Sequence, residues 1–216
     1  MSIEQKVSTH FEADAHRFDA IYESDKSPFM RFVDNVWRGV VRRRLDLALA
    51  CLEPLQGKSA LDIGCGSGRF CLAYAQRGAT RVVGIDFAPA MIELANQYAR
   101  QLEVADRCEF IVGTVPQDVP PGPYDVCSAI GFFDYVANPV PILTQMRELT
   151  RSKMIMSFPK RREWRIPLRR LRFRLSGCPL FLYSQGQIQK RLAQAGINRY
   201  DCITLDRDYI IVAYGE

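Results

Sequence analysis

Hydrophobic residues recur with two different periods along this chain, and together these periods predict strands that are separated by helices. Short apolar runs that suit buried strands stand at 59–63, 81–85, 108–112, 124–130 and 154–158. The stretches between them place apolar residues three or four positions apart, as in helices that pack on one face. Regular alternation of this kind predicts a parallel sheet with right-handed crossovers.

Glycine and proline mark the helix boundaries in these stretches. We expect helices at 69–77, 88–100 and 141–149. Gly78 follows the first helix in the position where glycine commonly ends one, and Pro89 stands in the first turn of the second. Each helix therefore connects one strand of the sheet to the next.

The end of the chain departs from this alternation. A capping box at 184–187 starts a helix that Gly196 ends, and two strands follow at 200–205 and 209–214. Only residues 206–208 separate these strands, so they must pair in antiparallel fashion. The fold class is therefore α/β: a Rossmann-like, seven-stranded, mostly parallel sheet with an antiparallel C-terminal hairpin and helices on both faces.

The first 53 residues are interpreted as an added helical segment. Apolar residues at helical spacing between Phe11 and Tyr22 predict a lid-like or docking helix. A second helix is expected after Pro28, with its apolar residues on the sheet and its basic face outward. The chain thus divides into an N-terminal segment, 1–53, and a main domain, 54–216. The residues of the basic face are Arg38, Arg42, Arg43 and Arg44.

Composition narrows the class of protein. Of the 216 residues, 48% are hydrophobic and 25% are charged, as in a soluble globular domain. We see no transmembrane stretch and no apolar signal-peptide core, and we expect a cytoplasmic protein. The seven cysteines form no C-x-x-C pair, and the two histidines, His10 and His16, are far from them in sequence. We therefore expect reduced thiols and no metal site.

A glycine-rich turn between the first two predicted strands is the clearest chemical signal. Residues 60–70 read A-L-D-I-G-C-G-S-G-R-F. Glycine at Gly64, Gly66 and Gly68 permits a sharp turn and lets a ligand lie close to the backbone. Asp86 ends the second strand, about twenty residues further on, where an acid can bind both hydroxyls of a ribose. The stretch predicts a cradle for a nucleoside.

Two departures from the dinucleotide pattern decide which nucleoside is expected. Pyrophosphate loops read G-x-G-x-x-G, but Arg69 takes the place of the last glycine and Gly68 comes one residue early. Asp62, just before the loop, would repel a pyrophosphate and can instead hold an amino group. We infer a ligand that carries an ammonium group and a ribose.

The order D-x-G-x-G-x-G, followed by an apolar strand that ends in Asp86, resembles the cofactor loop of class I S-adenosyl-L-methionine (SAM) methyltransferases. The three glycines and Asp86 occupy the matching positions, and the resemblance covers about residues 54–214. It implies SAM as cofactor, S-adenosyl-L-homocysteine (SAH) as product and a sheet closed by an antiparallel hairpin. The N-terminal pattern at 11–22 is most similar to small-molecule O-methyltransferases, with the magnesium-protoporphyrin and ubiquinone-pathway enzymes nearest.

The resemblance also implies contacts with the adenosine part of the cofactor. The family usually has an acid after the third strand that contacts the adenine amino group, whereas this chain has Gly113 and Thr114. We expect the hydroxyl of Thr114 to take that place, with the backbone or a nearby side chain as alternatives. Phe87, which follows Asp86, is included among the cofactor contacts.

At the other end of the cofactor, Gly131 and Phe132 are expected beside the sulfonium, because they follow the fourth strand. An aromatic face there stabilises a desolvated cation by about 0.5–2 kcal/mol. The equally weighted alternative is that Phe132 and Phe133 fill the core. The family pattern also suggests Tyr22 as a lid contact at the cofactor carboxylate.

Methyl transfer from SAM is an in-line displacement with a neutral thioether as leaving group, so positioning alone can supply most of the rate. A base is needed only for a weakly acidic nucleophile. Tyr135 and His10 are the catalytic candidates, with His16 and Tyr22 as further titratable groups. The chain lacks the N/D-P-P-Y/F pattern of enzymes that methylate planar amines, so methylation of base amino groups is not favoured.

A basic insertion at 160–180 is the most individual stretch of the chain. Its arginines surround leucines at helical spacing, and the family places substrate-binding elements here. Arg165, Arg169 and Arg172 are the candidates for binding an anionic substrate. The alternatives are a basic amphipathic helix on an anionic membrane, which would take a lipid-like substrate there, and a solvated basic face.

The leading hypothesis is a methyltransferase that moves a methyl group from SAM to oxygen, or less favourably nitrogen, of a small anionic or amphiphilic molecule. One alternative is an RNA-binding or RNA-modifying methyltransferase that uses the basic insertion on phosphate. Another is a binding protein without turnover, which the intact glycine loop argues against. Nucleic acid is not the expected partner in the leading hypothesis.

Overall fold

The computed structural model describes residues 39, 42–161 and 179–215. Seven strands form one sheet in the order β3-β2-β1-β4-β5-β7-β6. The strands are β1 (Ser59–Ile63), β2 (Arg81–Asp86), β3 (Cys108–Val112), β4 (Tyr124–Ala129), β5 (Thr150–Pro159), β6 (Tyr200–Leu205) and β7 (Asp208–Tyr214). Strands β3, β2, β1, β4 and β5 are parallel, and β7 and β6 are antiparallel to their neighbours. The predicted fold class is confirmed.

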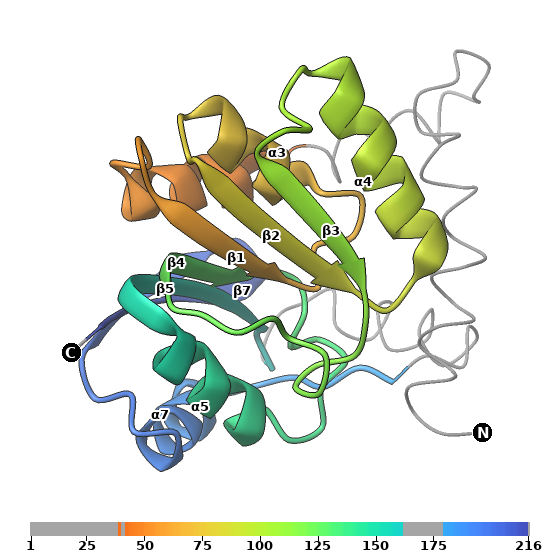
Figure 1. Cartoon of the computed structure of the whole chain (residues 1–216). Coiled ribbons are helices and arrows are strands. Elements are labelled where there is room, and N and C mark those ends of the chain that lie inside the picture. Colours follow the sequence, from red (N-terminus) through yellow and green to blue (C-terminus); the bar gives the residue numbers. More distant parts are fainter. Residues whose placement is uncertain (1–38, 40–41, 162–178, 216) are drawn as a thin grey trace.

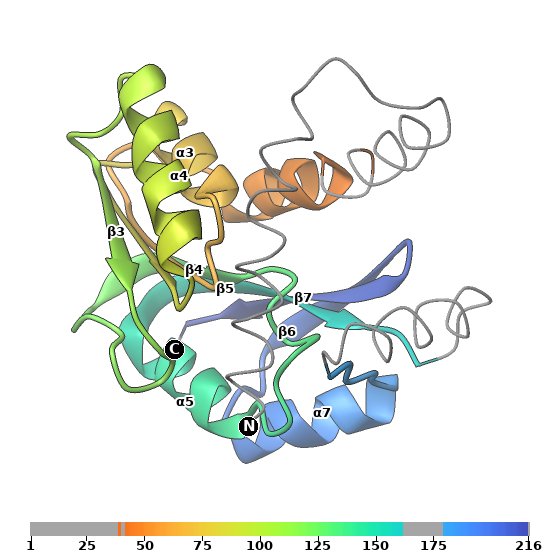
Figure 2. The same ribbon diagram turned by 90° about the vertical axis from the view of Figure 1, so that its right-hand side faces the viewer.

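Helices cover both faces of this sheet (Figures 1 and 2). The labelled helices are α3 (Arg69–Gln76), α4 (Pro89–Gln101), α5 (Val140–Leu149) and α7 (Gln185–Gln194). A further helical segment spans 42–52. In Figure 2, α3, α4 and this segment lie above the sheet, and α5 and α7 lie below it. The described chain is therefore a three-layer α/β/α arrangement.

The order of the strands fixes where a ligand can bind. The chain starts in the middle of the sheet with β1, proceeds outward to β3, and returns to pair β4 with the other side of β1. The loops after β1 and β4 therefore leave the sheet in opposite directions. In open α/β sheets, ligands bind in the crevice that forms at such a point, outside the carboxyl ends of the strands.

Alternation along β1 divides the core into two layers. Leu61 and Ile63 belong to the cluster under α5 and α7, whereas Ala60 belongs to the cluster under α3. Successive side chains of a strand point to opposite faces, so Asp62 shares the face of Ala60. This alternation decides the surroundings of Asp62, described below.

The predicted boundaries hold with two small corrections. β5 begins at Thr150, four residues before the predicted 154, because polar residues at its start also pair with neighbouring strands. β7 begins at Asp208, so two residues rather than three connect it to β6, and Asp206 takes a left-handed φ of 47°. The capping box between Ser184 and Gln187 is present in both directions.

The predicted outward basic face of the N-terminal helix is wrong for Arg44. Ala48 and Leu52 of segment 42–52 pack in the core as expected, and Arg43 is exposed. Arg44, however, is only 7% exposed and forms an ion pair with Asp208 at the start of β7. Helical periodicity gave no sign of this partner, which lies 164 residues away in sequence. Arg38 lies outside the described residues.

Candidate functional site

The glycine loop after β1 has the backbone conformation that its sequence predicts. Gly64, Gly66 and Gly68 all have positive φ, with +69° at Gly64 and +53° at Gly66. A Cβ at Gly64 would lie 2.5 Å from the ring of Phe132, whereas a Cβ at Gly66 would have no protein atom within 4 Å. Gly64 is thus required by packing, and Gly66 leaves open space beside the backbone, which suits a closely bound ligand.

The Asp86 carboxylate joins this loop to the helix that follows β2. Its Oδ2 accepts a hydrogen bond from the Gly66 N–H at 2.9 Å, and its Oδ1 accepts one from the Ala88 N–H at 3.0 Å, at the start of α4. Burial raises the pKa of Asp86, and the backbone hydrogen bonds oppose that shift. Each carboxylate oxygen can accept more than one hydrogen bond, so the group can still receive ribose hydroxyls.

Asp62 is buried under α3 instead of being open at the loop. It is 2% exposed, and its Oδ1 accepts a hydrogen bond from Ser128 Oγ at 2.6 Å. Its Oδ2 lies 3.7 Å from Cys71 Sγ, which donates to it. Burial raises the pKa of Asp62 to about 7. The structure therefore shows Asp62 inside a polar network, and its assignment to the cofactor ammonium stays a prediction.

The end of β3 supplies an acid that the sequence reasoning did not name. Both the N–H and the hydroxyl of Thr114 donate to Oδ2 of Asp118, at 2.8 and 2.9 Å. A Cβ at Gly113 would lie 2.7 Å from the Cβ of Asp118, so the carboxylate stands directly beside the Gly113–Thr114 backbone. These hydrogen bonds from Thr114 lower the pKa of Asp118, which is therefore ionised at neutral pH.

The signal that would have identified Asp118 was a threonine followed four residues later by an acid, which suits a turn closed by side-chain hydrogen bonds. The turn therefore places a carboxylate beside Thr114, and the adenine contact assigned to Thr114 stays a prediction. Phe87, which follows Asp86, packs at the edge of a small cluster with Ala88 and Met91 of the next helix.

The two phenylalanines in the turn after β4, Phe132 and Phe133, have different surroundings. Phe133 is fully buried and stacks on Phe158, with ring centroids 4.7 Å apart, so it fills the core. Phe132 is partly buried and lies against Gly64 of the cofactor loop. Gly131, with φ +79°, donates its N–H to Ser157 Oγ at 2.7 Å. Phe133 thus fills the core, whereas Phe132 packs between that core cluster and the glycine loop, and its contact with the cofactor stays a prediction.

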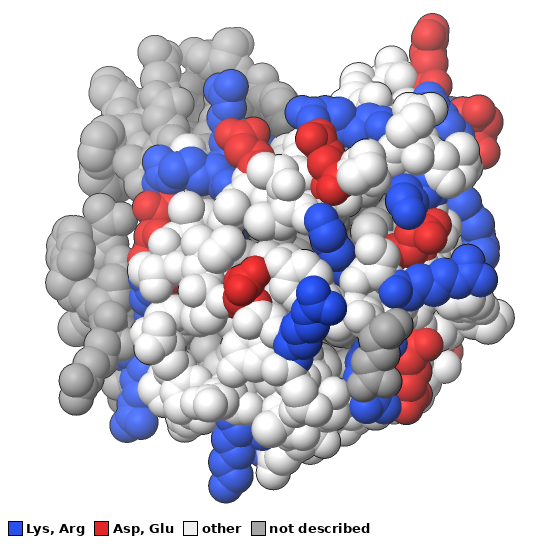
Figure 3. All heavy atoms as spheres, turned by 90° about the vertical axis from the view of Figure 1, so that its left-hand side faces the viewer, with Lys and Arg blue, Asp and Glu red and all other residues white. Residues whose placement is uncertain are grey.

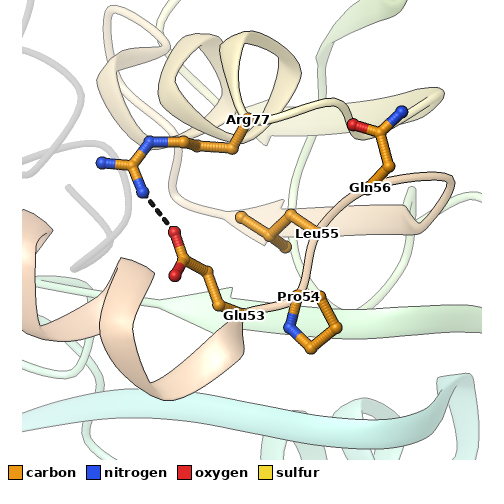
Figure 4. Close-up of a pocket in the computed structure, with 5 residues that line it drawn as sticks. All are labelled: Glu53, Pro54, Leu55, Gln56 and Arg77. Carbon is orange, nitrogen blue, oxygen red and sulfur yellow. Dashed lines mark hydrogen bonds and ion pairs between the residues drawn. The ribbon is translucent and has the colours of Figure 1, made fainter.

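A surface pocket elsewhere in the molecule does not belong to this site (Figure 4). It is lined by Glu53, Pro54, Leu55, Gln56 and Arg77, with an ion pair between Arg77 and Glu53. These residues precede β1 and follow α3, so the pocket lies at the amino ends of the parallel strands. The cofactor loop is at the opposite, carboxyl end.

A family model described as a methyltransferase domain matches residues 55–172, which is more than half of the chain. The chain belongs to this family. The match includes the glycine loop, Asp86, the Thr114–Asp118 turn and Gly131–Phe132. The predicted recognition of a class I methyltransferase is thereby confirmed.

Similar proteins agree with this assignment. This methyltransferase domain is 31% identical over 110 residues to a ubiquinone biosynthesis O-methyltransferase of Vibrio atlanticus, covering 50% of this chain and 45% of the relative. It is 40% identical over 75 residues to a ribosomal protein L11 methyltransferase of Alteromonas mediterranea, covering 35% of this chain and 25% of that one. The chain thus spans less than half the length of these curated relatives.

Solved structures have the same fold as the described part of the chain. Magnesium protoporphyrin IX methyltransferase from Synechocystis, solved with bound SAH, matches all of this chain and all of its own, with a TM-score of 0.80 and 21% identity. The same enzyme with bound SAM gives a TM-score of 0.77. At this identity the likeness shows the fold alone.

The structure brings together part of the predicted site. Nine of the predicted residues lie at the carboxyl ends of β1, β2, β3 and β4 or in the loops that follow: Gly64, Gly66, Gly68, Asp86, Phe87, Thr114, Gly131, Phe132 and Tyr135. Asp62 is described but buried beneath the loop, and five further predicted residues lie outside the described residues: His10, Tyr22, Arg165, Arg169 and Arg172. Their assigned roles stay predictions, as do the domain limits at 53 and the insertion at 160–180.

Proposed function

We propose that this methyltransferase domain binds SAM at the carboxyl ends of β1 and β2 and transfers its methyl group to a small molecule. The observation that carries the proposal is the loop itself: open space beside Gly66 next to a carboxylate, Asp86, that is already held in place by two backbone N–H groups. An adenosine ligand needs this combination, because its ribose hydroxyls are best bound by an acid at this position.

The residues present fit the cofactor along its length. Asp86 would bind the ribose, the Thr114–Asp118 turn would bind the adenine amino group, and Gly131 with Phe132 would lie at the sulfonium end. SAM supplies an activated methyl group when it is bound. The protein then has to hold an acceptor in line with that methyl, with Phe132 and Tyr135 lining the approach. Tyr135 is also the described candidate for removing a proton from the acceptor.

A small acceptor is proposed because relatives named for ubiquinone biosynthesis and magnesium protoporphyrin both resemble this chain. The ribosomal protein L11 methyltransferase also resembles it, so the comparisons alone do not identify the acceptor. The proposal of transfer to oxygen of an anionic or amphiphilic molecule rests on the sequence resemblance and on the basic insertion. The RNA alternative rests on that same insertion, most of which lies outside the described residues.

The described surface adds little to the choice of acceptor. On the face drawn in Figure 3, the described Lys and Arg side chains are interspersed with Asp and Glu, and neither sign forms a continuous area. Among the described helices, none combines the length and the apolar character that a membrane span requires. Contact with a membrane surface stays a prediction that depends on 160–180.

Titration calorimetry with SAH tests the cofactor proposal. We expect Asp86→Ala to weaken binding at least about 30-fold, because two hydrogen bonds to a charged group are lost. Asp125→Ala is the matched control: Asp125 also binds a backbone N–H, that of Ser59 at 2.8 Å, but at the amino end of β4. Unchanged SAH affinity in Asp86→Ala would refute the ribose assignment.

The acceptor is tested by incubating the protein with methyl-labelled SAM and a fractionated cell extract. We expect the label to appear in a small organic molecule, which mass spectrometry then identifies, and to be strongly reduced with Asp86→Ala when SAM is limiting. Label found in the RNA or protein fraction instead would contradict the small-molecule proposal while leaving the cofactor assignment intact.

A further inference from the structure

Arg44 is a buried cation with no role in the cofactor loop. It comes from the helical segment 42–52, is 7% exposed and forms its ion pair with Asp208, which is 1% exposed. The Nε of Arg44 donates to Asp208 Oδ2 at 2.9 Å, and Nη2 donates to the same oxygen. A buried ion pair is costly to desolvate and is weak evidence for stability alone, so its position calls for an explanation.

Arg44 reaches the turn that follows β4. Its Nη1 lies 3.5 Å from the position that a Cβ added at Gly131 would take, so the guanidinium lies beside the open face of this glycine. Gly131 has φ +79°, and its N–H donates to Ser157 Oγ of β5. The turn therefore has a hydrogen bond to β5 and the guanidinium of segment 42–52 beside it.

The charges around Arg44 come from both of the elements that it connects. Burial alone lowers the pKa of Arg44, but the negative charges of Asp208 on β7 and Asp134 in the turn outweigh this, and the pKa is raised. Asp134 is itself 4% exposed, and its carbonyl accepts a hydrogen bond from the Phe181 N–H at 2.8 Å. Arg44 therefore interacts electrostatically with Asp208 of β7 and with Asp134 of the turn.

We propose that Arg44 is a positioning residue for the Gly131–Tyr135 turn, with Asp208 as its anchor. Its contribution to methyl transfer rests on the proposed function, which puts this turn between the cofactor and the acceptor. The consequence is that segment 42–52 helps to position the turn beside the acceptor through one buried side chain, that of Arg44. The planar guanidinium can bind its anchor and reach the turn at the same time. Its Nε and Nη2 bind Asp208, while Nη1 lies on the side of Gly131.

The test compares two ion pairs that connect the same two elements. Arg43 Nε and Asp206 Oδ2, 2.8 Å apart, also join the helix to the β6–β7 hairpin, but Arg43 is half exposed. The test variant is Arg44→Gln with Asp208→Asn, and the control variant is Arg43→Gln with Asp206→Asn. Replacing both partners avoids an unpaired buried charge, which would unfold a single variant. Melting temperatures confirm that both proteins are folded.

Hydrogen–deuterium exchange of the free protein is the deciding measurement, since it requires neither SAM nor an acceptor. We expect peptides covering 131–135 to exchange at least about tenfold faster in the Arg44/Asp208 variant, with unchanged exchange at 60–63 and 82–86 and no change in the control variant. Equal exchange at 131–135 in wild type and both variants, or equal acceleration in both variants, would overturn the proposal. Failure of wild type to bind SAH would contradict the proposed function and leave this result standing.

Discussion

The proposed cofactor side and the proposed acceptor side of the site are built in different ways. Most of the cofactor side is one continuous stretch, from Ala60 to Asp86, and its parts contact each other directly, as in the bond from Gly66 to Asp86. The acceptor side is proposed to combine the Gly131–Tyr135 turn, which also meets the sulfonium end of the cofactor, with Arg44, Ser157 and Asp208, from four separate segments. A local motif can specify the first, whereas the second depends on long-range packing. Under this proposal, the same fold could keep one cofactor and change its acceptor.

The largest expected effect tests how far the cofactor side depends on a residue outside the 60–86 stretch. Asp62 on β1 depends on Ser128 of β4, and burial raises its pKa from 3.8 to about 7. Between these values the folded protein keeps a proton that the unfolded chain releases, so stability falls as pH rises through this window and is constant above it. By linkage, the raised pKa of Asp62 makes the free energy of unfolding about 4 kcal/mol lower above this window than below it.

Asp62→Asn removes this titration and keeps an acceptor for the Ser128 hydroxyl. Urea unfolding of both proteins between pH 4 and pH 8 measures the effect. The free energy of unfolding of wild type, relative to that of the variant, should fall steadily from pH 4 to about pH 7. A constant difference over the whole range would show that Asp62 is ionised in the folded protein.

The next largest effect tests a direct contact between the two sides, that of Phe132 on Gly64. Gly64→Ala combines a left-handed φ with a Cβ 2.5 Å from the Phe132 ring, whereas Gly66→Ala has the φ alone. We expect losses of about 3 kcal/mol and about 1 kcal/mol in the free energy of unfolding. Gly66→Ala should nevertheless weaken SAH binding, because its Cβ enters the space left for the ligand.

Adding Phe132→Ala to Gly64→Ala should recover the part of the loss that is due to the clash, while adding it to Gly66→Ala should not. Chemical denaturation of the four variants measures both differences. Equal losses for the two glycine substitutions would show that Phe132 does not pack on the loop, and that the two sides are independent.

The fold was predictable because its signals are local. The strand runs, Gly78, Gly196 and the capping box at Ser184 each depend on a few neighbouring residues, and all appear in the structure. The start of β5 was missed because polar residues there are paired in the sheet although they do not show an apolar pattern.

The acceptor side was less predictable because its contacts have no local signal. Arg44 followed the basic pattern of its helix, and only the folded chain places Asp208 within reach. Phe132 and Phe133 are adjacent in sequence, and periodicity cannot say which one faces the core. Asp118 was missed because its link to Thr114 is a turn interaction that the family pattern does not contain.

Two fully buried serines offer a matched comparison of the two sides. Ser128 supports Asp62 on the cofactor side, and Ser157 accepts the Gly131 N–H on the acceptor side. Replacing either by alanine removes one hydrogen bond, to the buried Asp62 carboxyl or from the part-buried Gly131 N–H, at a cost of about 1–2 kcal/mol. The readouts should differ: Ser157→Ala should speed amide exchange at Gly131, and Ser128→Ala should raise the pKa of Asp62 further. Exchange at Gly131 that changes equally in both variants would contradict the division into two sides.

The smallest expected effect concerns Asp118, which lies on the cofactor side but outside its continuous stretch. If the carboxylate accepts a hydrogen bond from the adenine amino group, the protein should prefer SAH to the inosine analogue, in which an oxygen replaces that amino group. Asp118 is exposed, so water competes and the preference should be about three- to tenfold. Asp118→Asn should reduce this preference by weakening SAH binding, because an amide oxygen is a weaker acceptor than a carboxylate.

Thr114→Val is the informative companion to this substitution, since it removes the hydroxyl that holds Asp118 while the Thr114 N–H still donates to the carboxylate. A partial loss of preference would show that Thr114 acts through Asp118. A complete loss in Thr114→Val with none in Asp118→Asn would instead make the threonine hydroxyl the direct contact, as the sequence suggested. Competition calorimetry with the two ligands separates these cases. Either result decides whether Thr114, directly after β3, or Asp118, in the loop that follows, makes the adenine contact.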